Sequence, residues 1–493
     1  MSTRLSASTL GRLPPGIKVP SYDRGSLKAG ILHVGIGNFH RAHQAVYLDD
    51  LFNMGESLDF ALLGAGVRAG DEAMRVALAG QDYLTTVVEQ EAGSMEARVT
   101  GAMIDFIPPA DRTATIDAMC DPAIRIVSLT ITEGGYFVDA STGSFDVGHP
   151  EIVADGAAPE DPKTVFGMIV LALKRRRAAD IPAFTVLSCD NLPHNGSVTR
   201  KAVVGLARLS DVDFAGWIDA NVAFPNCMVD RITPATSERE KRILAEDFGI
   251  DDAWPVFCES FRQWVVEDKF PTGRPALEKV GVEFVPDVAP YELMKIRILN
   301  GGHAVIAYPA GLMGIHFVHE AMENDLVTAF LQKIETEEII PEVPPVPNTD
   351  IADYFTLIQR RFANPKIGDT VRRLCLDGSN RQPKFIVPTI ADRLVKGLSV
   401  TGLALESALW CRYCFGTTDA GETIEPNDPN WPRLQATAQK AKDDPMAWLA
   451  MGDVYGDVGK SDAFAKAFAT ALDSLWTKGT KATVEAYLSD RLV

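Results

Sequence analysis

Three polar residues of complementary chemistry lie close together in an otherwise apolar stretch. The stretch YELMKIRILNGGH contains the amine of Lys295, the amide of Asn300 and the imidazole of His303. At about 100° per residue on an α-helix, the three lie near 0°, 140° and 80°, within one arc of about 140°. A base, an amide donor and an imidazole on one helix face favour proton transfer beside a developing negative charge. A polar face exposed to solvent, with the apolar neighbours in the core, is the alternative.

A glycine turn near the N-terminus follows a short apolar run. Residues 30–37 (GILHVGIG) lead into Asn38, so that Gly35, Gly37 and His40 occupy the three positions of a G-x-G-x-x-G motif. The first glycine permits a tight turn, and the second lets a pyrophosphate approach the backbone at the start of the following helix. The pattern predicts a dinucleotide site, although other strand-to-helix turns also contain glycines. Histidine in the third position predicts wider helix–strand spacing or a specific role of the ring near the phosphates.

Charged residues beside this turn are candidates for further contacts with the dinucleotide. Arg41 stands where the helix begins, where it could pair with a phosphate or simply be solvated. Asp71 follows the second expected strand, residues 60–66, and could accept a hydrogen bond from the adenosine ribose. Arg68 is beside it and could accept a 2′-phosphate instead. The motif therefore predicts NAD, with NADP as the alternative.

Strands and helices alternate in the first part of the chain. Strand 30–34, the turn, helix 41–54 and strand 60–66 form a βαβ unit. Further β-like runs are separated by helical patterns, which predicts a mostly parallel sheet covered by helices. The β-like runs are residues 83–88, 124–132 and 184–188, and the helical ones are 164–179 and 195–209.

Helical patterns dominate after about residue 290, and strand signals almost vanish. We therefore expect a boundary near Pro286–Pro290, with a Rossmann-type domain over residues 1–287 and a mainly helical domain over residues 288–493. The expected helices are residues 291–312, 321–336, 351–361, 371–376, 400–415, 431–441 and 461–476.

The composition of the chain excludes several classes of protein. Its 493 residues include 48 Lys+Arg and 66 Asp+Glu, a formal net charge of −18, which argues against nucleic acid or an anionic membrane as partner. No apolar run approaches the roughly 18 residues that span a bilayer. The seven scattered cysteines fit reduced thiols in the cytoplasm. Cys411-x-x-Cys414 has no second ligand pair nearby, so we expect no metal site.

Several blocks together resemble the polyol-specific long-chain dehydrogenases, the mannitol dehydrogenase family. Lys295-x4-Asn300-x2-His303 is similar to the family signature K-x-x-x-x-N-x-x-H, and histidine in the glycine turn is normal there. The resemblance extends from about residue 10 to beyond residue 390. Other matching blocks are residues 35–43, 130–136, 188–196 and 222–234.

The resemblance implies a metal-independent, reversible oxidation of a polyol to a ketose, with D-mannitol and D-fructose as the expected pair. It places the active site between the two domains, with Lys295 as general base and Asn191, Asn300 and His303 around the reacting alcohol. Asn191 follows strand 184–188, at the strand end where open α/β sheets bind ligands. The resemblance assigns the substrate to Asp230, Arg373 and Arg381. The matching blocks assign the cofactor to Gly35, Gly37, Asn38, Phe39, His40, Arg41 and Glu133, and Arg68 and Asp71 are further cofactor candidates by their position after the second strand.

Some roles stay open at this level. A lysine with its ordinary pKa of about 10.4 is a poor base at neutral pH, so the site must lower that pKa. Glu292, three residues earlier, is either a proton relay or an ordinary helix ion-pair partner. The alternative functions are an arabinitol or sorbitol dehydrogenase, a hexuronate (fructuronate) reductase and, least favoured, a non-catalytic NAD-binding regulator. Family members often work as monomers.

Overall fold

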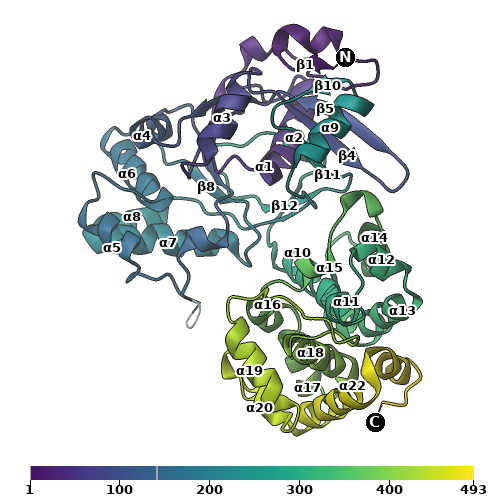
Figure 1. The fold of residues 1–493 in the computed structure, drawn as a ribbon. Helices are drawn as coiled ribbons and strands as arrows, with labels where there is room; N and C mark the ends of the chain where they lie inside the picture. The colour runs from purple at the N-terminus through teal and green to yellow at the C-terminus, as the bar shows by residue number, and fades with distance from the viewer. Residues whose placement is uncertain (1, 140–142, 493) are drawn as a thin grey trace. The chain divides into compact units, whose positions relative to one another are not determined.

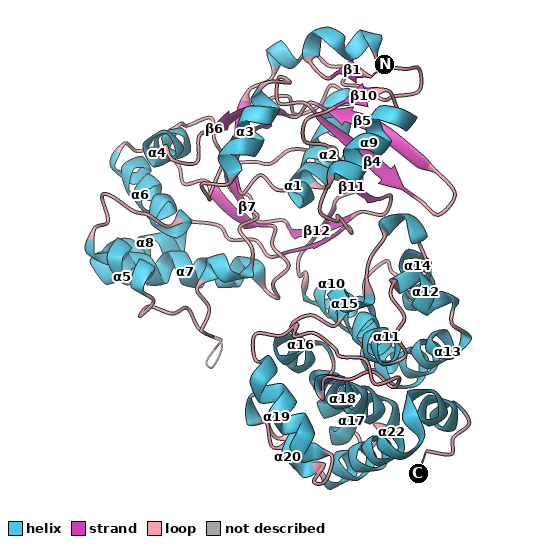
Figure 2. Ribbon diagram, viewed as in Figure 1, coloured by secondary structure: helices cyan, strands magenta, loops and turns pink. Residues whose placement is uncertain are grey.

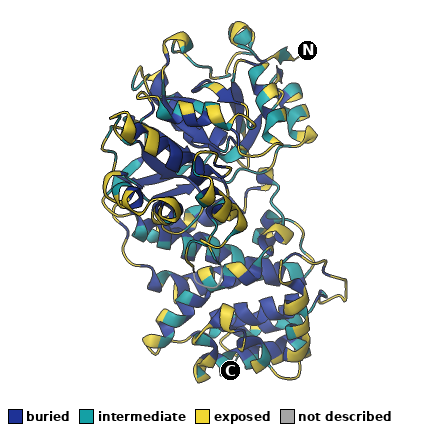
Figure 3. Ribbon diagram, turned by 90° about the vertical axis from the view of Figure 1, so that its left-hand side faces the viewer, coloured by how far each residue is buried: buried dark blue, intermediate teal, exposed yellow. Residues whose placement is uncertain are grey.

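A computed structural model describes residues 2–139 and 143–492 of the chain. The chain divides into two compact units, Met1–Ala289 and Pro290–Val493 (Figure 1). Each unit buries its own apolar side chains, which appear as dark ribbon in Figure 3. The two units are described separately below.

A five-stranded parallel sheet forms the centre of the first unit. The strand order is β6-β3-β2-β7-β8, and every neighbouring pair is parallel. The strands are β2 (Ala29–Val34), β3 (Ala61–Ala65), β6 (Met103–Ile107), β7 (Ile126–Leu129) and β8 (Thr185–Ser188). This arrangement confirms the expected Rossmann-type fold.

Side chains alternate between the two faces of the sheet, as the pleat of a strand requires. Leu32 and Val34 of β2 pack into a core with α4 (Arg112–Cys120), α6 (Val165–Ala178) and α7 (Asn195–Ser210). Ile31 packs into a second core with α2 (Gln44–Asn53). The sheet is therefore covered on both faces, and its strand ends remain for ligands.

The prediction that all β-like runs belong to one mostly parallel sheet is wrong for residues 83–88. That run is β4 (Thr85–Gln90), which pairs antiparallel with β5 (Met95–Thr100) and parallel with β11 (Val256–Glu259) in a separate sheet. Separate small sheets also contain β9 (Cys227–Asp230), β12 (Gln263–Glu267) and β13 (Glu283–Val285), and β1 (Thr3–Arg4) with β10 (Ile250–Asp251). The pairing of Val87 in β4 with Val256 in β11 leaves no local pattern, whereas β5 follows β4 directly and forms a local hairpin with it.

The helix expected over residues 41–54 is also interrupted. It is divided into α1 (Asn38–Ala42) and α2 (Gln44–Asn53) by His43, whose φ of −117° and ψ of −84° are not helical. The His43 ring is fully buried, and its Nε2 lies 2.8 Å from the carbonyl oxygen of Gln263. The helix thus breaks at His43, where the side chain makes a tertiary contact. The helical periodicity of the sequence does not reveal this break.

The second unit is helical, and its described residues contain isolated β-bridges but no named strand (Figure 2). Its α22 (Asp462–Leu488) consists of two helical segments joined by a kink at Gly479, and it packs against the buried α18 (Thr401–Cys414). The helix α11 (Gly301–Leu312) also packs on α18. The remaining helices include α12 (Val318–Glu323), α13 (Asp325–Ile334), α14 (Ile351–Phe362), α15 (Val371–Leu374), α16 (Gly378–Phe385), α17 (Val387–Val395) and α19 (Trp431–Ala441).

Two of the expected long helices are irregular. Residues 291–312 are α10 (Ala289–Met294), a π-helical turn over Lys295–Asn300, and then α11. Residues 321–336 break at Asn324, whose side chain accepts hydrogen bonds from the amides of Leu326 and Val327 and so caps α13. A π turn contains one extra residue, which apolar periodicity alone does not indicate.

Candidate active site

The glycine turn after β2 has the geometry that its glycines require. Gly35 has a φ of +97°, and a Cβ there would lie 2.1 Å from the carbonyl oxygen of Thr130, so a side chain cannot be accommodated. At Gly37 the nearest atom to a Cβ would be the Gly35 carbonyl oxygen, 4.0 Å away. The backbone is therefore open at Gly37, where the start of α1 offers N–H groups to a dinucleotide phosphate.

His40, which replaces the third glycine of the motif, lies flat against a second histidine. Its ring centroid is 3.5 Å from that of His33 in β2, and the ring planes differ by 17°. Both rings are at most 1% exposed. Burial lowers the pKa of His40 to about 3, with a smaller contribution from Arg41, so the ring is neutral. The stacked rings of His33 and His40 thus form the contact between β2 and α1. A glycine at position 40 would instead let the helix and the strand pack directly against each other.

The neighbouring residues of α1 anchor the turn to a distant loop. Arg41 is 1% exposed, and its guanidinium donates to the carbonyl oxygen of Trp254 and to Asn38 Oδ1. Asn38 Nδ2 in turn donates to the carbonyl oxygen of Pro234 at 3.2 Å, and the Phe39 ring stacks on His43. The guanidinium of Arg41 is committed to these groups, which favours an anchoring role over a phosphate contact.

Two charged residues follow β3, and the structure distinguishes them. Asp71 Oδ2 accepts from the backbone amides of Val67 and Arg68, at 2.8 and 2.9 Å, so this carboxylate braces its own loop. Arg68 is exposed, and its Nη2 donates a hydrogen bond of 3.4 Å to Thr132 Oγ1. Glu133, also exposed, begins a short 3-10 helix directly after Thr132. The arginine is therefore the more available of the two charged groups after β3.

Asn191 follows β8 in a loop that its neighbour Asp190 holds in place. Asp190 accepts from the backbone amides of Ile131 and Thr132, both at 2.9 Å, and from the Tyr136 hydroxyl at 2.6 Å. Burial raises the pKa of Asp190, although these donors oppose the shift. The loops after β7 and β8 are thereby joined at the strand ends, where ligands of open α/β sheets bind.

Asp230 ends β9 and is 6% exposed. The next residue, Arg231, turns its guanidinium to the carbonyl oxygens of Ala42 and Glu259 and to Glu89 Oε1, at 2.6 to 2.9 Å. The ion pair of Arg231 is with Glu89, so the guanidinium of Arg231 joins β9 to the elements around it.

In the second unit, the π turn begins at Lys295 and ends at Asn300. Its hydrogen bonds join residues five apart, so Lys295 and Asn300 lie closer to one helix face than the 140° of an α-helix implies. Lys295 and Glu292, one turn earlier, are both 7% exposed. The angular arrangement predicted for a regular α-helix is therefore wrong, and the correction favours a shared face for the amine and the amide.

His303 lies in the first turn of α11 and stacks on Phe362, with ring centroids 4.1 Å apart. Its Nε2 is buried and has no hydrogen-bond partner within the described part of the chain. Burial lowers the pKa of His303 well below its ordinary value, and the guanidiniums of Arg373, Arg361 and Arg381 lower it further. A neutral imidazole with an unused ring nitrogen is suited to a ligand hydroxyl.

The two arginines predicted to contact substrate have different surroundings. Arg373 makes a two-pronged ion pair with Asp369, one helical turn earlier, and 48% of its side chain is exposed. Arg381 Nη1 donates to the carbonyl oxygens of Arg373 and Leu374, at 3.4 and 3.1 Å. Arg381 thus supports the C-terminal end of α15. The ion pair with Asp369 balances part of the charge of Arg373.

Several residues that hold these groups are not evident from the sequence motifs. His33, Thr130 and Asp190 are single polar residues in or beside apolar strands, which is the one local signal that could have identified them. Their partners lie about 55 to 100 residues away in the chain, so the sequence does not indicate what they bind.

Residues 2–139 and 143–492 contain no group of three or more His, Cys, Asp or Glu placed to hold a metal ion. Within the same ranges, no helix combines the length and the apolar character needed to span a membrane.

Comparison with known proteins gives a consistent assignment. The sequence model of the mannitol dehydrogenase Rossmann domain matches residues 29–279, and that of the mannitol dehydrogenase C-terminal domain matches residues 287–476. A mannitol 2-dehydrogenase of Cereibacter sphaeroides is 62% identical over 471 residues, which cover 95% of this chain and 98% of that protein.

Two solved structures share the whole fold. Mannitol 2-dehydrogenase of Pseudomonas fluorescens, in a ternary complex with NAD and D-mannitol, is 45% identical, with a TM-score of 0.89 over 99% of this chain and 100% of that one. A D-sorbitol dehydrogenase in substrate-free form is 36% identical, also with a TM-score of 0.89, over 97% of this chain and 100% of that one. The chain belongs to the mannitol dehydrogenase family.

Proposed function

We propose that this protein is an NAD-dependent polyol 2-dehydrogenase whose preferred reaction is the reversible oxidation of D-mannitol to D-fructose. The observation that carries the proposal is the run from Lys295 to His303, where a buried amine, an amide and an imidazole follow one another around a π turn. The Pseudomonas fluorescens neighbour, solved with NAD and D-mannitol, supports the same substrate. In this proposal residues 1–287 bind NAD, and residues 288–493 carry the substrate-binding and catalytic groups.

Lys295 is the general base and takes the proton of the C2 hydroxyl. NAD, when bound, supplies the hydride acceptor. Asn300 and Asn191 donate amide N–H groups to the oxygen as it gains negative charge. His303 holds a neighbouring hydroxyl through Nε2, because its neutral ring can either donate or accept there. Glu292, which is as little exposed as Lys295, relays the proton towards water.

The contacts with the rest of the polyol involve Asp230, Arg373 and Arg381. A carboxylate accepts hydrogen bonds from hydroxyls, and a guanidinium donates to them. The arginines around His303 favour a second candidate, a hexuronate reductase, since a substrate carboxylate needs a cation. The ion pair of Arg373 with Asp369 and the backbone contacts of Arg381 reduce the charge on offer, so a neutral polyol suits the site better.

The residues around the glycine turn suit a dinucleotide, because Gly37 leaves space where a Cβ would be and Gly35 adopts a conformation closed to other residues. Beyond these glycines, the exposed Arg68 and Glu133 are the proposed side-chain contacts with the cofactor, whereas Asn38, Phe39, His40, Arg41 and Asp71 hold the two loops around it. Since Arg68 is exposed and Asp71 braces its own loop, we expect measurable activity with NADP beside that with NAD. Arg68→Ala should lower kcat/KM for NADP several-fold and leave NAD nearly unchanged.

One assay tests the reaction. Purified protein is given NAD with D-mannitol, D-sorbitol or D-arabinitol, and NADH with D-fructose or D-fructuronate, and absorbance of NADH is followed. We expect the highest kcat/KM with D-mannitol, and a fall in kcat of about 10²- to 10⁴-fold in Lys295→Ala. Preference for fructuronate would favour the reductase. Turnover of no polyol would contradict the proposal and leave a non-catalytic regulator as the alternative.

The seven cysteines are all free, and six of them are buried. Free thiols suit a reducing compartment, so we place the protein in the cytoplasm. We also propose that it works as a monomer, which light scattering on the purified protein would test.

A further inference from the structure

His33 is a buried histidine near the carboxyl end of β2, directly opposite Ser128 of β7 in the parallel register. Its Nδ1 lies 2.7 Å from Ser128 Oγ, and its Nε2 lies 2.9 Å from Thr130 Oγ1. Both ring nitrogens are therefore used inside the sheet. None of the family blocks assigned above gives this residue a role.

The direction of these hydrogen bonds follows from the next partner. Thr130 Oγ1 donates to the carbonyl oxygen of Gly35 at 2.6 Å, and a hydroxyl has one hydrogen to donate. Thr130 must then accept from the Nε2–H of His33. A neutral imidazole has a single N–H, so Nδ1 accepts from the hydroxyl of Ser128. The chain of donors thus runs from Ser128 through His33 and Thr130 to Gly35 in one direction.

This chain ends on the turn that is proposed to carry the cofactor. Gly35 has a positive φ, and the Thr130 backbone fills the space beside it, so Thr130 holds Gly35 through both its backbone and its side chain. The His33 ring also supports His40, on the far side of the turn, through the stack at 3.5 Å. One ring therefore supports the turn at both ends. Burial lowers the pKa of His33 far below its ordinary value, and nearby His40 lowers it further.

We propose that His33 and Thr130 are positioning residues that set the affinity for the dinucleotide by holding the glycine turn in its binding conformation. The proposal rests on the proposed function, since it requires the dinucleotide to bind at this turn. Neither residue need touch the reacting atoms. The expected signature is a weaker affinity for cofactor with an unchanged response to polyol.

The first test compares two substitutions of Thr130 by fluorescence titration with NADH. Thr130→Val keeps the shape but loses the hydroxyl, and it should raise the Kd about five- to tenfold, as expected for one lost hydrogen bond. Thr130→Ser keeps the hydroxyl and should stay within about twofold of wild type. KM for D-mannitol at saturating NAD should not change. Thr100→Val is the control, because the Thr100 hydroxyl also donates to a backbone carbonyl oxygen, that of Thr85, away from the turn.

The second test is a double-mutant cycle. His33→Phe keeps a flat ring against His40 but loses both polar contacts, and it should raise the Kd about as much as Thr130→Val. The double variant should be no weaker than either single one, because both remove the same chain. An unchanged Kd in Thr130→Val, or equal losses in Thr130→Val and Thr130→Ser, would overturn the inference. If wild-type protein binds no NADH at all, the proposed function fails instead.

Discussion

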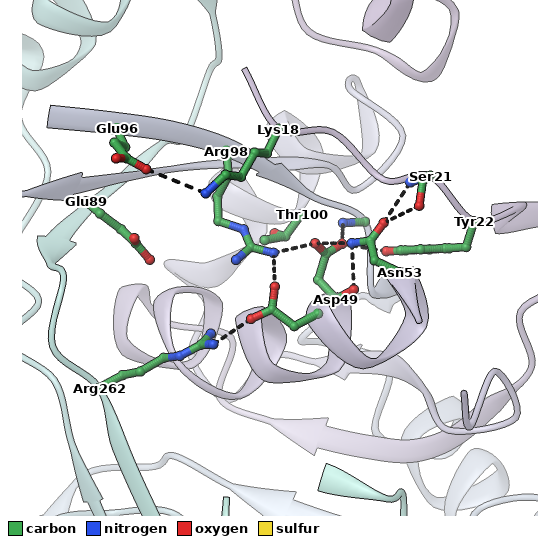
Figure 4. Close-up of polar contacts among 12 residues, drawn as sticks. Lys18, Ser21, Tyr22, Asp49, Asn53, Glu89, Glu96, Arg98, Thr100 and Arg262 are labelled. Atoms are coloured by element: carbon green, nitrogen blue, oxygen red, sulfur yellow. Dashed lines mark hydrogen bonds and ion pairs between the residues drawn. The ribbon is translucent and has the colours of Figure 1, made fainter. Parts of the chain in front are cut away.

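The two units accommodate buried carboxylates in different ways, by ion pairs with arginines in the first unit and by burial that favours the protonated form in the second. In the first unit, Asp49 of α2 accepts from Tyr22 Oη at 2.6 Å, the Gly101 amide at 2.9 Å and Arg98 Nη2 at 2.9 Å (Figure 4). Arg98 also binds Asp50, which in turn binds Arg262. Burial alone would raise the pKa of Asp50, but the two arginines hold it below its ordinary value. Burial raises the pKa of Asp49 in spite of Arg98, so within this cluster pairing with cations outweighs burial at Asp50.

In the second unit, Glu335 and Glu406 are completely buried without a cation in ion-pair contact within the described residues. Neither carboxylate oxygen of Glu335 has a hydrogen-bond partner there, and Oε1 lies 3.0 Å from where a Cβ on Gly302 would be. Glu406 Oε1 accepts from Gln382 Nε2 at 2.5 Å. Burial raises the pKa of Glu406 to about 8 and that of Glu335 far above its ordinary value. Burial thus favours the protonated, neutral form of both acids.

The buried carboxylates of the two units should therefore respond differently to pH. A paired carboxylate stays charged, and losing its partner leaves a buried charge behind. A protonated carboxylate stabilises the fold only while the pH is low enough to keep its proton. Glu335 lies against Gly302, the residue next to His303, so the acid without partners adjoins the proposed substrate-binding helix. The following substitutions test this contrast.

The largest effect is expected from Arg98→Met, which removes the cation that Asp49 and Asp50 share. The free energy of unfolding should fall by about 3 to 5 kcal/mol, because a buried charge loses its partner. Urea denaturation at pH 7 measures the change. Lys18→Met is the control, since Lys18 pairs with Glu96 on the surface and should change stability by less than about 0.5 kcal/mol. Equal effects of the two substitutions would contradict the contrast.

Glu406→Gln should stabilise the protein in a pH-dependent way. The native pKa is raised, so the contribution of Glu406 is complete below its unfolded pKa of about 4.3 and is lost as the pH rises through about 8. Glutamine mimics the protonated acid and keeps the acceptor for Gln382. The variant should gain about 3 kcal/mol at pH 7 and nothing at pH 4. Thermal unfolding across this range measures it, and a gain independent of pH would exclude the mechanism.

Glu335→Met should give a smaller gain, about 1 kcal/mol at pH 7, by removing buried polar atoms that have no partner. The gain should increase with pH, because the native protein must keep Glu335 protonated while the unfolded chain need not. Glu335→Gln is the matched variant, since it removes the pH dependence but keeps unpartnered polar atoms. A loss of stability at pH 8 in both variants would show that Glu335 is charged and paired.

Some features of the fold followed directly from local patterns. The glycine turn between an apolar run and a helix predicted the βαβ unit, and β2, α2 and β3 confirm it. Helical periodicity after residue 290 predicted the second unit correctly, because an amphipathic helix shows its buried face in its own sequence. The separate sheet of β4 was missed, since its parallel partner β11 lies far away in the chain, with Val87 opposite Val256.

The candidate site likewise combines features that the sequence shows with features that depend on the fold. The residue types in the sequence fix which chemical groups the site can use. These are the glycines of the turn, the amine of Lys295, the amides of Asn191 and Asn300 and the imidazole of His303. The partners of these groups are visible in the tertiary structure alone. There, Lys295 and Asn300 share a π turn, and Asp71 braces its own loop. His33 supports Gly35 through Thr130. The physical reason is that residue type sets what a side chain can donate or accept, whereas its partner is set by segments far away in the chain.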